Sequence, residues 1–229
     1  MSHLAGETRD PVELYSRLAP SYDLLHRRWL KYAGGEAQAA LEAAVRVAYR
    51  PGAALLDVGC GTGVFARTLL SEGVAAEDLT LLDPSAAMLN RCADLPCPKV
   101  PGRLEALPFP SARFEIVTCA WALETSADAA LALQELCRVL RPGGALCLAF
   151  CADKPARGPV DWMMRQALLR RGTGRFLCVS RVVDLVAAAG AAEIRVIPLA
   201  GPVAALVARG ASAATRLGCR SDQARPAAA

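Results

Sequence analysis

Apolar residues in the first part of the chain recur at helical spacing. Between residues 12 and 48 they follow a period of about 3.6 residues, which is typical of helices with one buried face. Pro20 interrupts this pattern, and the pair Gly34–Gly35 interrupts it again. We therefore predict two or three helices ahead of the first strand.

From residue 51 onwards, short apolar runs alternate with helical patterns. The runs are bounded by glycine, proline or charged residues, as buried strands are. A proline-rich stretch follows the second of these runs. Because proline lacks a backbone donor, any strand near residues 99–104 should be short or lie at an edge of the sheet. The predicted strands are 51–59, 79–83, 113–123 and 145–151, and the predicted helices are 64–73, 84–93, 127–140 and 180–190.

Two further strand-like runs follow, at residues 193–199 and 203–209. The short Ala-Gly-Pro connection between them predicts an antiparallel hairpin. Alternating strands and helices that end in a hairpin are typical of an α/β, Rossmann-like, doubly wound sheet with a mixed end. Residues 211–229 are predicted to form a disordered tail.

The composition favours an ordinary globular domain. The chain has 229 residues, enough for one domain with a complete core. Hydrophobic residues make up 54%, but many are alanine, and the longest apolar run, 196–208, is shorter than the roughly 18 residues that cross a bilayer. The N-terminus lacks the pattern of a secretory signal.

The cysteines and charges narrow the class further. The chain has nine cysteines, an odd number, and no CxxC pair. They are typical of small core residues in a reducing compartment, so we expect a cytoplasmic protein. We also expect no metal site, because the spacing of metal-binding cysteines is missing. The net charge of +4 is mild and its basic residues are scattered, so we expect no nucleic-acid partner.

The stretch "LLDVGCGTG", residues 55–63, carries the clearest chemical signal. Its glycines follow a buried strand, where α/β sheets bind ligands. A dinucleotide fingerprint would place its third glycine one residue later, and Val64 occupies that position. Asp57 would repel a pyrophosphate but suits a cation such as S-adenosylmethionine (SAM), which carries an ammonium and a sulfonium group. A solvated carboxylate at the strand end is the alternative for Asp57.

A second carboxylate, Asp83, ends the next predicted strand. An ionised aspartate only accepts hydrogen bonds, so it can bind both hydroxyls of an adenosine ribose. The alternative role is the N-cap of the helix that begins near Pro84.

With these features in sequence order, residues 53–150 resemble class I SAM-dependent methyltransferases. The matching motifs are "LLDVGCGTG", "LTLLDPSAAML", "LEALPFPSARFEIVTCAWALE" and "ELCRVLRPGGALCLAF". Within this class, "YSRLAPSYDLLHR" and "LAGPVAALVARG" resemble the ubiquinone/menaquinone-biosynthesis C-methyltransferases. The resemblance implies a seven-stranded sheet with the last strand antiparallel, an N-terminal helical lid at 1–48 and a methyltransferase domain at 49–210.

The resemblance also implies a set of site residues. S-adenosyl-L-methionine would lie over the glycine loop, with its ribose on Asp83 and its amino-acid end near Tyr22 and Asp23. Tyr22 and Asp23 could equally serve helix packing and a solvated charge. The residues implied to bind the cofactor are Asp57, Gly59, Cys60, Gly61, Gly63, Asp83, Pro84, Met88 and Tyr22.

One position departs from the family pattern. The family places an Asp-Ala pair before "EALPF", where the aspartate holds the adenine amino group, and this chain has Arg103-Leu104. Arginine has no acceptor atom. The adenine contact is therefore either absent or supplied by Glu105 or the main chain.

Few catalytic side chains are expected, because SAM is already activated and methyl transfer depends mainly on orientation. An acceptor phenol would need a general base, for which His26 and Glu124 are candidates. We assign Trp121, Trp162 and Met163 to the acceptor site, with core packing and an ordinary amphipathic helix as the alternatives.

The predicted function is methyl transfer to a small, apolar acceptor, with a quinone-ring precursor as the first hypothesis. Phospholipid or natural-product N- or O-methylation and a non-catalytic binding partner with a SAM fold are the alternatives. The apolar and basic residues at 157–175 also predict a peripheral membrane contact. The sequence does not define the oligomeric state.

Overall fold

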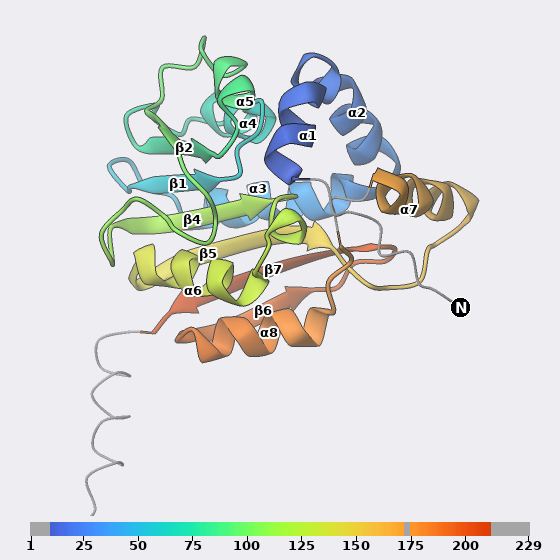
Figure 1. The fold of residues 1–229 in the computed structure, drawn as a ribbon. Coiled ribbons are helices and arrows are strands. Elements are labelled where there is room, and N and C mark those ends of the chain that lie inside the picture. Colours follow the sequence, from blue (N-terminus) through green and yellow to red (C-terminus); the bar gives the residue numbers. More distant parts are fainter. Residues whose placement is uncertain (1–9, 172–174, 212–229) are drawn as a thin grey trace, which may run out of the picture.

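The computed structural model describes residues 10–171 and 175–211. Seven strands form one sheet in the order β3-β2-β1-β4-β5-β7-β6. Strands β1 to β5 are parallel where they pair, and β7 runs antiparallel to both β5 and β6 (Figure 1). The predicted α/β fold, with its antiparallel last strand, is confirmed.

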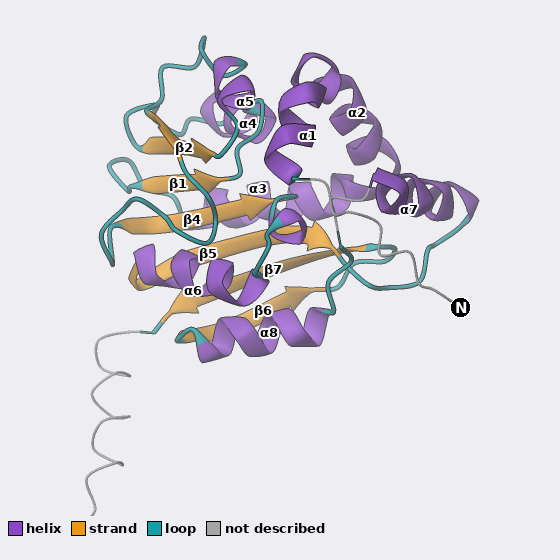
Figure 2. Ribbon diagram, viewed as in Figure 1, coloured by secondary structure: helices purple, strands orange, loops and turns teal. Residues whose placement is uncertain are grey.

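The elements follow the predicted alternation along the chain (Figure 2). The strands are β1 (Leu55–Val58), β2 (Leu79–Asp83), β3 (Lys99–Pro101), β4 (Phe114–Ala120), β5 (Leu140–Cys151), β6 (Ala191–Ile197) and β7 (Val203–Gly210). The helices are α1 (Pro11–Leu18), η1 (Ala19–Ser21), α2 (Tyr22–Trp29), η2 (Leu30–Gly34), α3 (Gly35–Ala48), α4 (Val64–Ser71), α5 (Ala86–Asn90), η3 (Leu123–Thr125), α6 (Ala129–Val139), α7 (Pro159–Arg171) and α8 (Val179–Ala188).

The N-terminal helices differ from prediction at one of the two expected breaks. Pro20 does end a helix, since α1 and α2 are joined there by a short 3-10 segment. At Gly34–Gly35 the chain stays helical, because the π-helical segment η2 leads directly into α3. A Cβ on Gly34 would lie 2.4 Å from the Trp29 indole nitrogen, so this glycine serves close packing and does not end the helix.

A further difference concerns the start of a strand. Strand β5, predicted at 145–151, already begins at Leu140 and pairs irregularly with the start of β4. The predicted tail at 211–229 lies outside the described residues, apart from Ala211. The edge position of the short strand β3 matches the proline-based prediction.

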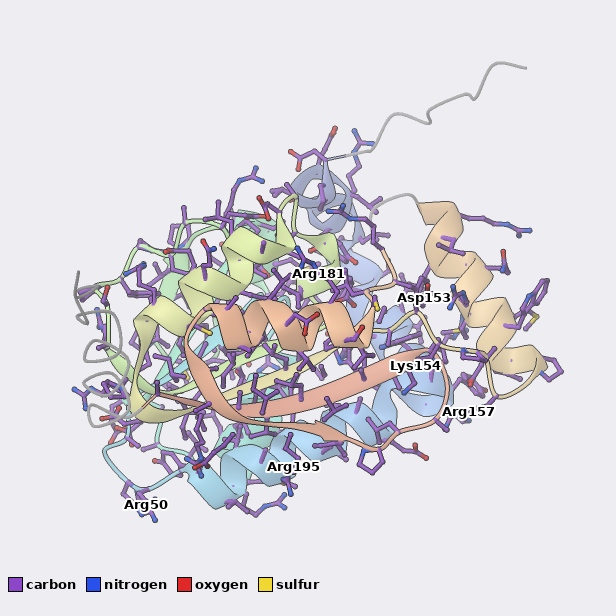
Figure 3. All side chains as sticks on the ribbon, turned by 90° about the horizontal axis from the view of Figure 1, so that it is seen from below. Arg50, Asp153, Lys154, Arg157, Arg181 and Arg195 are labelled. Atoms are coloured by element: carbon purple, nitrogen blue, oxygen red, sulfur yellow. The ribbon has the colours of Figure 1, made fainter. Side chains whose placement is uncertain are left out.

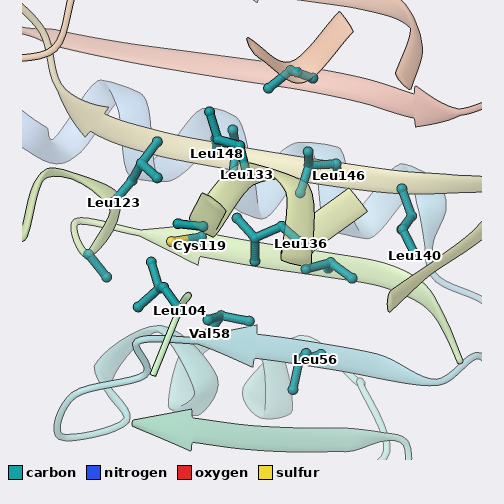
Figure 4. Packing of buried hydrophobic residues seen from close by; sticks show 14 of the residues in the cluster. Leu56, Val58, Leu104, Cys119, Leu123, Leu133, Leu136, Leu140, Leu146 and Leu148 are labelled. Carbon is teal, nitrogen blue, oxygen red and sulfur yellow. The ribbon is translucent and has the colours of Figure 1, made fainter. Parts of the chain in front are cut away.

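The sheet has an apolar core on each face, which follows from the alternation of side chains along its strands. Leu56 and Val58 of β1 face one core, which α6 and α8 cover (Figure 4). Leu55 faces the other core, which α3 and α4 cover. No helix in the described ranges is both long and apolar enough to cross a membrane.

The N-terminal helices pack against the carboxyl end of the sheet. Ser16 of α1 and Ser85, which caps α5, share a hydrogen bond of 2.7 Å. Thr62 of the glycine loop donates to Asp23 of α2 at 2.6 Å. Helices α1 and α2 therefore lie over the loop that follows β1.

Candidate active site

A cavity of about 430 Å³ opens where the carboxyl ends of β1, β2 and β4 meet α1 and α2. Open α/β sheets bind ligands at this edge. Its lining includes Tyr22, Gly59, Gly61, Asp83, Pro84, Met88, Arg103, Leu104, Glu105, Trp121 and Glu124.

Asp83 is fixed at the floor of this cavity by two backbone donors. Its Oδ2 accepts from the Gly61 amide at 2.9 Å, and its Oδ1 accepts from the Ser85 amide at 2.8 Å. Burial raises the pKa of Asp83, and these two hydrogen bonds oppose the rise. Ser85 is the residue that caps α5, so the predicted N-cap alternative for Asp83 is wrong. The carboxylate instead joins the glycine loop to the end of β2.

Asp57 is buried beneath the glycine loop. Its Oδ1 accepts from the Thr118 hydroxyl at 2.9 Å, and its Oδ2 has no hydrogen-bond partner among the described residues. Burial raises its pKa to about 7. Asp57 does not belong to the cavity lining, so it would influence a ligand there only through the glycine loop. A buried, ionised carboxylate with an unpartnered oxygen is unfavourable, and a cationic ligand nearby would compensate its charge.

The glycine loop itself needs bare backbone at Gly59. Its φ is +72°, and a Cβ would lie 2.3 Å from the Cβ of Ala122. Gly61 has a φ of +55° and lies beside Tyr22. Cys60 and Gly63 do not line the cavity and approach Cys92 of the segment after α5.

Replacing Gly59 by alanine should lower the free energy of unfolding by about 3 kcal/mol, through left-handed strain and overpacking. Gly73→Ala is the matched control, because Gly73 has a φ of +97° but nothing within 4 Å of its added Cβ. Urea unfolding of Gly59→Ala, Gly73→Ala and the double variant Gly59→Ala/Ala122→Gly would separate the two causes. The double variant should recover part of the loss. Equal losses for Gly59→Ala and Gly73→Ala would contradict the packing argument.

Three residues that the sequence analysis singled out lie on helix α2. Two of them lie beside the glycine loop, and the third lies away from the cavity. Tyr22 lines the cavity, and Asp23 holds Thr62. His26 is buried behind Tyr22, with their rings stacked 5.5 Å apart. Burial lowers the pKa of His26, and its side-chain bond to Gln38 opposes this shift. His26 does not line the cavity, so this arrangement does not support it as a general base.

The end of β4 supplies the opposite wall. Trp121 has a φ of +61°, a strained conformation for a bulky residue that is common at functional sites. Its indole nitrogen donates to Gln38 Oε1 at 3.3 Å. Glu124 follows in η3 and is 6% exposed, its Oε1 accepting from the Cys151 amide at 3.4 Å. Its Oε2 has no partner among the described residues, and burial raises the pKa of this carboxyl.

Two predicted acceptor residues lie elsewhere. Trp162 and Met163 are on the outer side of α7 and are 57% and 60% exposed. Neither belongs to the cavity lining. The apolar and basic residues of this segment suggested that it forms a wall of the acceptor pocket. In the structure, the inner side of α7 is formed by Met164 and Leu168.

Several lining residues were not predicted. Asp10, Val12 and Tyr15 enter the cavity from α1, and Thr125, Ser126 and Ala127 enter from the loop after β4. Arg175, from the basic segment 157–175 noted in the sequence, also lines the cavity and donates to the carbonyls of Ser126 and Ala127. The helical period of α1 was visible in the sequence, but the surface that this helix covers was not.

The unusual Arg103-Leu104 pair lies on the cavity wall, with Arg103 exposed and Leu104 buried. Glu105, the predicted alternative for the adenine contact, also lines the cavity. Its Oε1 accepts from the Ser126 hydroxyl at 2.5 Å and from the Ala127 amide at 2.8 Å. This carboxylate is therefore partly engaged in holding the loop after β4.

Asp83 in the cavity and Asp57 below the glycine loop suit a ligand that combines a sugar diol with a cation. Asp83 faces the cavity with spare acceptor capacity, and Asp57 has an uncompensated oxygen below the loop. The bare backbone of Gly61 allows close approach of the ligand. Within residues 10–171 and 175–211, no group of three or more His, Cys, Asp or Glu side chains could hold a metal ion.

The chain is similar in sequence and in fold to known methyltransferases. Residues 56–148 match the methyltransferase domain family. The ubiquinone/menaquinone biosynthesis C-methyltransferase UbiE of Bordetella parapertussis is 33% identical over 174 residues, which cover 69% of this chain and 64% of that protein. The malonyl-[acyl-carrier protein] O-methyltransferase of Erwinia billingiae is 35% identical over 135 residues, which cover 58% and 50% of the two chains. The chain thus spans less than two thirds of the length of these relatives.

A solved structure shares the fold. A SAM-dependent methyltransferase from Thermotoga maritima superposes with a TM-score of 0.67 at 19% sequence identity. The match covers 86% of this chain and 98% of that one.

Proposed function

We propose that the chain is a class I SAM-dependent methyltransferase, with S-adenosylmethionine as its cofactor, and that it methylates a small, apolar acceptor. The observation that carries this proposal is the composition of the cavity. Gly61 and Asp83 suit the cofactor, while Tyr15 and Trp121 offer aromatic surface for a second ligand. Such apolar pockets with a few polar groups are typical of small-molecule sites.

The chain's contribution to the reaction would be to bind, orient and exclude water. Bound SAM supplies a methyl group on a sulfonium, which needs no further activation. The carboxylate of Asp83 would hold the ribose hydroxyls, and the glycine loop would shape the path of the cofactor's amino-acid end. Helices α1 and α2 cover the cavity, and this cover would keep donor and acceptor aligned in a water-poor site.

For the acceptor, we propose a hydroxylated aromatic ring of the quinone-precursor type. The name of the Bordetella relative supports this class, while the Erwinia relative carries a different printed activity. Methylation of a phenolic ring requires a group that accepts the phenol proton. We assign that role to Glu124, because it lines the cavity and its Oε2 is unpartnered within the described residues.

Purified protein should therefore convert SAM to S-adenosylhomocysteine when supplied with a naphthohydroquinone that lacks its ring methyl group. Mass spectrometry would locate the added methyl on carbon, oxygen or nitrogen across a panel of phenols, amines and phospholipids. Turnover of an amine or phospholipid alone would reject the quinone-precursor hypothesis but keep the methyltransferase proposal. Cofactor binding without turnover of any class would favour the non-catalytic alternative, which Arg103 in the adenine position supports.

Glu124→Gln should lower kcat by roughly 10²- to 10⁴-fold, the usual contribution of a positioned proton acceptor. Because burial raises the pKa of Glu124, the wild-type rate should rise with pH as this carboxyl ionises. The Glu124→Gln variant should not show this rise. The control is Glu105→Gln, which should change cofactor affinity but keep the pH profile. An unchanged pH profile in Glu124→Gln would remove this residue from the mechanism.

We also propose a cytoplasmic location. The eight cysteines among the described residues are all free thiols, which supports a reducing compartment.

A further inference from the structure

Helix α7 is apolar on two opposite sides. Its inner side is packed through Met164 and Leu168 against the core that lies under α3 and α4. Its outer side exposes Trp162, Met163 and Leu169, which lie within two turns of each other. A soluble surface helix normally pairs an apolar inner side with a polar outer side. The outer apolar stripe of α7 is therefore unexplained by the fold.

A second outward stripe lies on the neighbouring helical segment. Helix α7 packs against η2, which continues α2. Along α2 and η2, five residues at helical spacing are exposed, and three of them are cations. The residues of this stripe are Leu24, Arg27, Arg28, Lys31 and Tyr32.

The cations of the stripe on α2 and η2, and Arg170 near the end of α7, have no acidic partners within the described part of the chain. Arg27, Arg28, Lys31 and Arg170 form no ion pair there, whereas Arg157 and Arg165 at the start and middle of α7 are paired with Asp161 and Asp153. Lys31 lies over the ring of Tyr32, 5.3 Å from its centroid. Exposed apolar side chains and uncompensated positive charge are thus combined on adjacent helices.

We propose that this surface, formed by the outer sides of α2, η2 and α7, docks on an anionic membrane. Segments that lie at a bilayer surface combine tryptophan and aliphatic side chains with lysine and arginine. A symmetric self-contact would bring the unpaired cations together, and a protein partner would need a matching acidic surface. The charge pattern therefore favours lipid headgroups over a protein partner or a second copy.

The position of this surface relates it to the cavity. Helix α2, which carries the basic stripe, also places Tyr22 in the cavity lining. Figure 1 shows α7 at the same end of the molecule as α1 and α2. Docking there would place helix α2, whose opposite side carries Tyr22 into the cavity lining, against a bilayer. The docking surface does not depend on the identity of the acceptor.

Vesicle sedimentation and tryptophan fluorescence would test this proposal on the full chain. Trp29 and Trp121 are buried, so a blue shift on binding would report mainly on Trp162. The protein should sediment with vesicles of phosphatidylcholine and phosphatidylglycerol, with a blue shift, and not with vesicles of phosphatidylcholine alone. Sedimentation with both vesicle types to the same extent, or with neither, would overturn the proposal.

Variants would separate the surface from general charge effects. Arg27→Gln/Arg28→Gln should weaken binding to anionic vesicles roughly 25-fold, about five-fold for each cation lost near an anionic surface. Trp162→Ser/Met163→Ser should also weaken it, with an unchanged melting temperature as the check of folding. Arg181→Gln/Arg195→Gln is the matched control, because both arginines are exposed on α8 and β6 (Figure 3).

Two results of these variants would overturn the proposal. One is an equal loss of vesicle binding in the Arg181/Arg195 control, which would indicate unspecific attraction. The other is concentration-dependent self-association in the ultracentrifuge, with the Trp162 blue shift already present in the absence of vesicles. Neither result would bear on methyl transfer, which is measured in vesicle-free solution with a water-soluble phenol.

Discussion

Replacing Asp83 by alanine should weaken the binding of S-adenosylmethionine at least a hundred-fold. Each hydrogen bond to an ionised acceptor contributes about 1.5–3 kcal/mol, and a ribose offers two hydroxyl donors to this carboxylate. The same substitution removes the acceptor for the Gly61 and Ser85 amides, so the glycine loop would also lose its attachment to the end of β2. Both effects lower affinity, and they act on the same ligand.

Asp78→Asn is the matched control for Asp83→Ala. Asp78 also accepts two hydrogen bonds, from the Tyr49 hydroxyl and the Gly52 amide, each at 2.8 Å. It precedes β2, whereas the cavity lies at the carboxyl end of this strand. Equilibrium dialysis with labelled cofactor should show near-native affinity for Asp78→Asn. A comparable loss in both variants would indicate a general effect on folding and contradict a role of Asp83 in the site.

Replacing Asp57 by asparagine should change how stability depends on pH. The pKa of Asp57 is raised from 3.8 to about 7, so between these values the folded protein keeps a proton that the unfolded chain has released. The stability of the ligand-free protein should therefore fall as the pH rises from about 4 to about 7. At full ionisation this burial costs on the order of 4 kcal/mol.

Asparagine can still accept from Thr118 but cannot ionise, so Asp57→Asn removes this cost. Urea unfolding should find the two proteins alike near pH 4, with the variant more stable at pH 8 by several kcal/mol. Saturating cofactor should narrow the gap at pH 8 if a cation near Asp57 compensates its charge. A constant difference at all pH values would show that Asp57 is not a costly buried acid.

The sequence was sufficient to predict the sheet and the position of Asp83 at its carboxyl edge. Strand β2 begins and ends at the predicted residues, because its five apolar and polar positions are bounded by clear breaks. Asp83 lies in the cavity because the carboxyl ends of parallel strands meet at one edge. These features depend on local pattern and on topology, both of which a single sequence carries.

The sequence was insufficient to predict features that depend on tertiary packing. Gly34 looked like a helix break, but its lack of a side chain serves the approach of Trp29 and Trp121. Trp162 and Met163 looked like pocket residues, because composition does not reveal which side of α7 faces inward. Tyr15 was missed for the same reason, since its position in the cavity depends on the packing of α1 against α5.

The most direct test is a calorimetric titration of the purified, folded chain with S-adenosylmethionine near neutral pH. The described geometry predicts one site per chain and saturable heat, with competition by S-adenosylhomocysteine, which shares the ribose that Asp83 would hold. Absence of heat at millimolar cofactor, from protein with a cooperative unfolding transition, would contradict the assignment of this cavity to the cofactor.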